Sequence, residues 1–164
     1  MIYTKPIIFI SLAFLMLGCS QESNRIALTD PGFGITATTI HSRDEGEDVP
    51  ILLKSEEVIK GIQFTMVWDA RIGQVIKPAL TSANPGFTIS VNDSERGRMK
   101  VLVFSITGEE FNQTDSSIMS VPIRITDPEA QEFDLVFEDV IFAGPNATAY
   151  EIPVSHANLK IISK

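Results

Sequence analysis

The sequence predicts an all-β fold in which two sheets pack as a sandwich. From residue 34 onward, short runs rich in β-branched and aromatic residues alternate with turns made of Gly, Pro, Asn and Asp. No stretch keeps a helical period for long enough to form a stable helix on its own. The chain has 164 residues, which is enough for one domain and hardly for two.

The N-terminal segment differs from the rest of the chain. Lys5 precedes an apolar run over residues 7–17. This length is typical of the core of a signal peptide and is shorter than the roughly 20 residues of a membrane-spanning helix. The run ends at Gly18 and Cys19. Because Cys19 is the only cysteine, the chain cannot form an intramolecular disulfide.

This segment resembles the lipobox of bacterial lipoproteins, in which a small residue precedes a cysteine that is lipidated and becomes the mature N-terminus. The resemblance implies a signal peptide over residues 1–18 and a lipid on Cys19, which attaches the protein to a membrane of the bacterial envelope. Ser20 follows the cysteine, and in a Gram-negative cell this implies the outer membrane, with the domain facing the periplasm or the surface. The alternative is an ordinary signal peptide or N-terminal anchor with an incidental cysteine.

The mature chain is expected to be strongly acidic. The formal net charge is −8, and removing residues 1–18 takes away only the positive charge of Lys5, which gives −9. Such a charge repels nucleic acid phosphates and anionic lipid headgroups, so no nucleic-acid function is expected.

Residues 19–33 are polar with a Pro-Gly turn and are predicted to form the lipidated N-terminus and a tether. Residues 34–164 are predicted to form the domain. The expected strands are Gly34–Ser42, Val49–Ser55, Gly61–Asp69 and residues 74–80, 86–92, 98–106, 118–126, 133–143, 150–154 and 157–163. Within residues 133–143 the apolar alternation changes parity at Glu138 and Asp139, which predicts a β-bulge with one extra residue.

Three segments in this order resemble a cohesin domain: "GIQFTMVWDARIGQVIKPAL", "GRMKVLVFSITG" and "FDLVFEDVIFAGPNATAYEIPVSHANLKI". The first carries an aromatic-Asp pair at the end of a strand, and the third carries an acidic kink followed by a small-residue loop. The resemblance covers roughly residues 34–163. It implies a nine-stranded jelly-roll β-sandwich and a non-catalytic module that captures a dockerin-like partner. The partner face would come from residues 61–69 and 98–106, with the strand near residues 118–125 beside them.

Strand parity then predicts which side chains form that face. If Met99, Val101 and Val103 point into the core, their neighbours in the same strand point outward. The predicted partner-binding residues are Gln63, Thr65, Val67, Lys100, Leu102 and Phe104, an apolar centre with a polar rim. Two alternatives remain open: a loop over residues 109–117 covers this face, or the parity is reversed.

No motif for catalysis or metal binding stands out, and neither a cofactor nor an enzyme activity is expected. His41 and His156 are far apart in sequence, and no nucleophile, zinc or phosphate-loop motif occurs. The acidic turn over residues 44–48 lacks the ligand spacing of a calcium loop.

Polysaccharide binding is the main alternative function, because some carbohydrate-binding modules share the related two-sheet fold. Such modules usually present exposed Trp or Tyr rings. Trp68 is the only tryptophan and its parity places it in the core, while Tyr150 is the single tyrosine of the mature chain. A structural envelope lipoprotein without a ligand is the third possibility.

Overall fold

The computed structural model describes residue 28, residues 30–111 and residues 117–162. The predicted signal peptide, Cys19 and Ser20 lie outside these ranges, so the lipoprotein assignment stays a prediction. Within the described part of the chain, no helix is long and apolar enough to cross a membrane.

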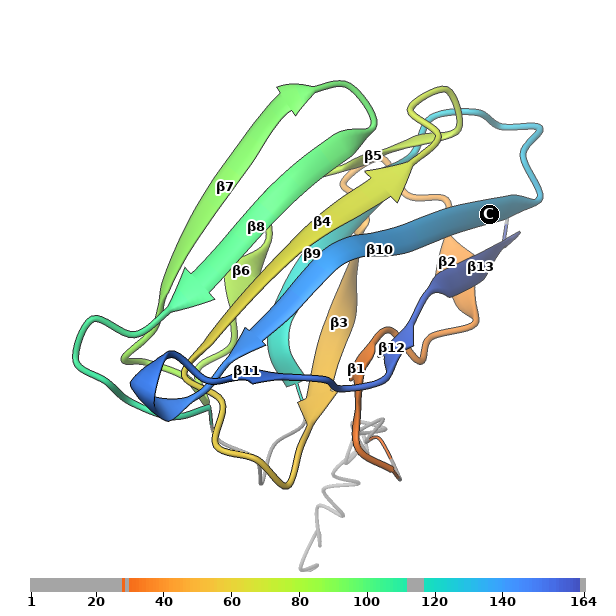
Figure 1. Cartoon of the computed structure of the whole chain (residues 1–164). Helices are drawn as coiled ribbons and strands as arrows, with labels where there is room; N and C mark the ends of the chain where they lie inside the picture. Colours follow the sequence, from red (N-terminus) through yellow and green to blue (C-terminus); the bar gives the residue numbers. More distant parts are fainter. Residues whose placement is uncertain (1–27, 29, 112–116, 163–164) are drawn as a thin grey trace, which may run out of the picture.

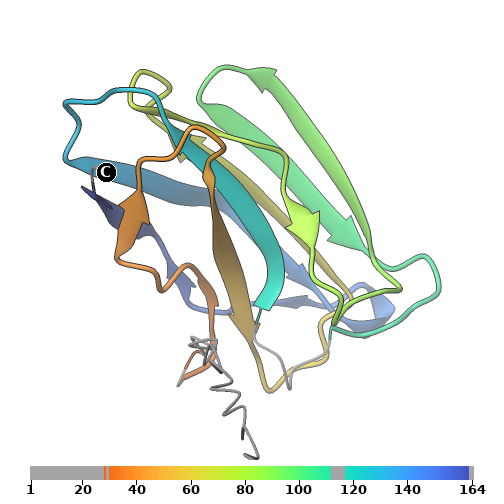
Figure 2. The ribbon, with the colours of Figure 1, turned by 180° about the vertical axis from the view of Figure 1, so that it is seen from behind.

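Two sheets pack face to face, which confirms the all-β sandwich (Figure 1). Sheet I has the order β12-β1-β3-β9-β5, and β6 also pairs with β9. Its strands are β1 (Gly32–Gly34), β3 (Glu47–Lys54), β5 (Gly73–Val75), β6 (Ala79–Leu80), β9 (Ser117–Ile125) and β12 (Val154–Ser155). Figure 2 shows this sheet from behind, with the long strand β9 in cyan.

Sheet II has the order β2-β13-β10-β4-β8-β7, and β11 pairs with β10. Its strands are β2 (Thr39–His41), β4 (Gly61–Trp68), β7 (Thr88–Glu95), β8 (Arg98–Phe104), β10 (Glu132–Ala143), β11 (Ala149–Tyr150) and β13 (Ala157–Ile162). A 3₁₀ turn, η1 (Pro145–Ala147), connects β10 to β11.

Several expected strands are divided. The expected strand over residues 34–42 is replaced by β1 and β2, which lie in different sheets. The segment over residues 74–80 splits into β5 and β6 around Pro78, and residues 150–154 split into β11 and β12 around Pro153. Proline has no N–H to donate to a ladder, which explains the last two breaks. The described residues therefore hold thirteen strand segments, several of them only two or three residues long.

The start of the domain is earlier than predicted. Gly32–Gly34 forms β1, which pairs with both β3 and β12, so the end of the predicted tether belongs to the sandwich. Phe33 is buried, and its ring centroid lies 5.2 Å from that of Phe64 and 5.2 Å from that of Phe137. A third ring, Phe142, lies 5.4 Å away. Aromatic pairs at such distances and tilts are favourable beyond their buried area, so β1 anchors the core between the sheets.

The predicted β-bulge in β10 is confirmed. Glu138 pairs with Thr65 and Ile141 pairs with Gln63, so three steps along β10 match two steps along β4. Asp139 has a φ of +50° within this bulge. The extra residue lets both Phe137 and Phe142 point into the core, although one is at an odd position and the other at an even one.

The strand expected beside the partner face lies in the other sheet. β9 pairs with β3, β5 and β6 in sheet I, whereas β8 has β4 and β7 as neighbours and β4 has β8 and β10. The sequence-based placement of residues 118–125 beside β4 and β8 is therefore wrong. A connection can cross between sheets of a sandwich, so sequence order does not determine which strands are neighbours.

Candidate functional site

The outer face of sheet II, which points away from sheet I, carries the predicted partner-binding residues. In β8, Met99, Val101 and Val103 are buried, which confirms the inward parity and rules out the reversed one. Lys100 and Leu102 alternate with them and are exposed, and Phe104 is half-buried. The apolar residues of β8 thus alternate: Val101 and Val103 point into the core, whereas Leu102 and Phe104 lie on the outer face.

Strand register places several apolar groups together at one end of this face. Gln63 of β4 pairs with Leu102 on one side and with Ile141 on the other. In the next outward-facing row, Gly61 pairs with Phe104 and with Ala143. A hollow of about 230 Å³, called the apolar hollow below, lies here. It is lined by Gly61, Ile62, Gln63, Leu102, Val103, Phe104, Ile141 and Ala143. Leu102 is 39% exposed and Ile141 is 48% exposed. A large side chain at this exposure leaves apolar area that a partner can cover.

Ile141 was missed by the sequence analysis, although the sequence held a signal for it. Once the bulge at Glu138 and Asp139 turns Phe142 inward, the residue before Phe142 must point outward. The pairing of Ile141 with Gln63 could not be foreseen, because it depends on β10 lying beside β4.

Two of the predicted partner-binding residues are less accessible than expected. Thr65 is only 4% exposed, and Val67 is half-buried. Both sit in the middle of sheet II, where longer side chains from β8 and β10 flank them: Thr65 pairs with Lys100 and Glu138, and Val67 pairs with Arg98. Thr65 therefore does not form part of an exposed rim.

The other end of the outer face is polar. The guanidinium of Arg98 donates to the carboxylate of Glu138 at 2.7 Å and lies 3.6 Å from that of Glu95. The side chain of Lys100 is exposed and forms no hydrogen bond or ion pair with another described residue. A polar hollow of about 220 Å³ lies here, lined by Thr65, Asn92, Ser94, Glu95, Arg98, Lys100 and Asp139. The face thus combines an apolar end with a charged end.

The described part of the loop after β8 does not cover the apolar hollow. Phe111 of that loop is buried and stacks on Phe87, with ring centroids 4.0 Å apart. Ile106 of the same loop is 80% exposed. Residues 112–116 lie outside the described residues.

A tight turn follows β4 at the aromatic-Asp pair. The backbone oxygen of Asp69 accepts hydrogen bonds from the amides of Ile72 and Gly73, at 3.1 and 3.3 Å. Its carboxylate accepts hydrogen bonds from the backbone amide and the guanidinium of Arg71, the shortest at 2.6 Å. The hydrogen bonds from the Arg71 side chain lower the pKa of Asp69 from 3.8 to about 2. The role of Asp69 here is to shape the turn.

We expect Arg71→Ala to raise the pKa of Asp69 toward 3.8, because its main hydrogen-bond donor is lost. The folded-state pKa is depressed, so the stabilisation from this pair is present above about pH 4 and is lost as the pH falls toward 2. A carboxyl-selective NMR titration of both proteins measures the midpoint. Arg43→Ala, at an exposed arginine in another turn, is the control and should leave it unchanged. An unaltered Asp69 midpoint in Arg71→Ala would contradict the assignment.

Both histidines have structural partners. The Nδ1 atom of His41 lies 3.0 Å from the carboxylate of Glu47, and the backbone amide of Phe137 donates to Nδ1 of His156 at 3.1 Å. Among the described residues, no group of three or more His, Cys, Asp or Glu side chains is arranged to hold a metal ion.

Trp68 is less buried than predicted. It packs against the core but remains half-buried, and its indole Nε1 donates to the backbone oxygen of Gly73 at 3.2 Å. Trp68 is the last residue of β4. Strand parity gives the direction of a side chain but not how completely its neighbours cover it, so parity alone overestimated the burial of Trp68.

No protein-family model matches the sequence, and no curated protein matches it. Solved structures show that the chain has the cohesin fold. The sixth cohesin of scaffoldin B from Acetivibrio cellulolyticus, in complex with a mutant Cel5 dockerin, is 21% identical, with a TM-score of 0.66; the match covers 80% of this chain and 99% of that one. A non-cellulosomal cohesin from the archaeon Archaeoglobus fulgidus is 13% identical, with a TM-score of 0.66 and coverages of 80% and 91%. The OlpA cohesin of Clostridium thermocellum, in complex with the dockerin Doc918, is 20% identical, with a TM-score of 0.62 and coverages of 80% and 99%.

Proposed function

We propose that this chain is a non-catalytic binding module that captures a protein partner on the outer face of sheet II. The observation that carries the proposal is the apolar hollow, where Leu102 of β8 and Ile141 of β10 keep much of their surface exposed on inner strands of sheet II. Gln63 lies between these two residues on β4, and Lys100 supplies a charged group beside the hollow on β8. An apolar centre with a polar rim is the usual composition of a protein interface.

A dockerin-like module of an exported enzyme is the candidate partner. Two of the three related structures described above are cohesins in complex with dockerins, which supports a protein partner. The charged end, with Arg98, Lys100 and Glu138, would set the orientation of the partner, because complementary charges fix register more than they add affinity.

The proposal includes attachment to the outer membrane through lipid on Cys19. Each buried methylene contributes about 0.8 kcal/mol, and more than one acyl chain is needed for stable anchoring. The module would then hold its partner at the cell envelope.

The test uses the full-length protein, purified in detergent, as bait for a detergent extract of its native cells. The wild type should capture a partner that binds Leu102→Asp at least about tenfold more weakly, since a carboxylate in the apolar hollow must lose its hydration. Leu102 is partly exposed, so the variant should stay folded by circular dichroism. The full-length chain is expected to be processed in the cell, so the purified bait should begin at Cys19 and its intact mass should include acyl chains.

Ile162→Asp is the matched control, because Ile162 is 42% exposed and lies on β13 of the same sheet, away from the hollow. It should capture the partner as the wild type does. Equal capture by wild type and Leu102→Asp, or none by either, would count against this face and favour polysaccharide binding or a purely structural role.

A further inference from the structure

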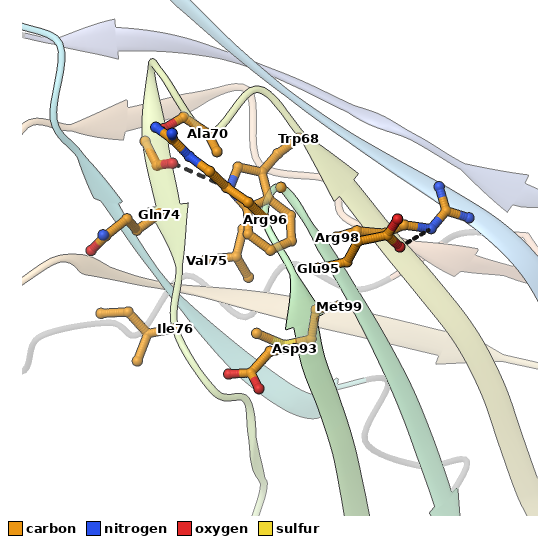
Figure 3. A pocket seen from close by; sticks show the side chains of 12 residues that line it. Trp68, Ala70, Gln74, Val75, Ile76, Asp93, Glu95, Arg96, Arg98 and Met99 are labelled. Carbon is orange, nitrogen blue, oxygen red and sulfur yellow. Dashed lines mark hydrogen bonds and ion pairs between the residues drawn. The ribbon is translucent and has the colours of Figure 1, made fainter.

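A third cavity lies between the two sheets, at the end where β4 finishes. Its volume is about 360 Å³, within the range of about 300–1,000 Å³ typical of small-molecule sites. Sheet I contributes β5, and sheet II contributes the ends of β4, β7 and β8 (Figure 3). Glu95 and Arg98 line both this cavity and the polar hollow, whereas none of the residues of the apolar hollow takes part.

The inner wall of this cavity is apolar and aromatic. Met99 and Val75 are buried at its base, and the half-buried indole of Trp68 lies beside them. The single donor of the indole is already used by the backbone oxygen of Gly73, so the ring offers a ligand its apolar surface. That hydrogen bond also fixes the orientation of the ring.

The rim is polar and has side chains free to bind. The side chains of Gln74 and Asp93 are exposed and form no hydrogen bond or ion pair with another described residue. One nitrogen of the Arg96 guanidinium donates to the backbone oxygen of Ala70 at 3.2 Å, which leaves its other donors available (Figure 3). The rim therefore offers an unpaired carboxylate, an amide and a guanidinium.

The charges of this rim cancel. Asp93 and Glu95 contribute two carboxylates to the lining, and Arg96 and Arg98 contribute two guanidiniums. An anion would meet the carboxylates and a cation would meet the guanidiniums, so neither is favoured. A neutral ligand that both donates and accepts hydrogen bonds, and that has one apolar face, fits these groups.

We propose that this cavity binds one neutral sugar ring. The C–H face of a pyranose would pack on Trp68, and its hydroxyls would bond to the Asp93 carboxylate, the Gln74 amide and the Arg96 guanidinium. This saccharide site shares Glu95 and Arg98 with the charged end of the protein-binding face, but it shares no residue with the apolar hollow.

Trp68 is the only tryptophan of the chain, so its fluorescence reports directly on the cavity. The full-length protein in detergent would be titrated with glucose, galactose, xylose, N-acetylglucosamine and cellobiose. At least one should change the emission saturably, with a Kd on the order of 1 mM. Mannitol, an open-chain polyol without a ring face, should not.

Exposed variants separate a site from an unspecific effect. Asp93→Ala and Gln74→Ala should each weaken the binding of the sugar by about tenfold, because each removes a hydrogen-bonding group. Asp44→Ala, at an exposed carboxylate in another turn, should bind as the wild type does. Leu102→Asp should also bind normally, so this result and that of the partner capture are independent.

Three outcomes would overturn the saccharide site. These are no saturable change with any of the five sugars, an equal change with mannitol, or unaltered affinity in both Asp93→Ala and Gln74→Ala.

Discussion

Phe33→Ala is expected to lower the free energy of unfolding by about 3–5 kcal/mol, the usual cost of truncating a buried phenylalanine. Phe33 is 1% exposed and its ring touches those of Phe64, Phe137 and Phe142. Removing the ring leaves a cavity between the two sheets, and closing that cavity would require the sheets to move toward each other. Urea unfolding followed by circular dichroism measures the loss.

The matched control for this prediction is Phe104→Ala, the same chemical change at a half-buried position on the outer face. It should cost clearly less, since less area leaves contact and water can fill the space. A loss of less than about 1 kcal/mol in Phe33→Ala would show that β1 does not contribute to the stable core.

Gly34→Ala is expected to destabilise the fold on the order of 3 kcal/mol, for a backbone reason. Gly34 has a φ of +147°, a conformation that side chains disfavour. A Cβ atom there would also collide with the backbone oxygen of Ser155 in β12, which pairs with β1. Backbone in a paired strand cannot move aside without breaking the pairing. The shift of the urea midpoint measures the effect.

Gly108→Ala separates the two causes. Gly108 also has a positive φ, +80°, but a Cβ atom there would meet nothing within 4 Å. Gly108→Ala should lower the free energy of unfolding by only about 1 kcal/mol, the cost of placing a side chain on backbone with a positive φ. If Gly34→Ala costs no more than Gly108→Ala, the close approach of β1 to β12 is not a constraint on the fold.

The sequence by itself determined the properties that depend on neighbouring residues in one strand. Side chains alternate with a period of two, so the inward direction of Met99, Val101 and Val103 follows from the pattern of β8 alone. The bulge at Glu138 and Asp139 follows in the same way, because only one extra residue reconciles Phe137 with Phe142. Together with the turn pattern, these features were enough for the all-β sandwich.

Only the tertiary structure decided which strands lie side by side. β9 lies in sheet I and not beside β4 and β8, β1 belongs to the core and not to a tether, and Ile141 meets Gln63 across two strands. The cavity beside Trp68 likewise forms where β5 of one sheet lies over the ends of β4, β7 and β8 of the other. These are contacts between residues far apart in the chain, set by crossing connections and strand register, and no local pattern encodes them.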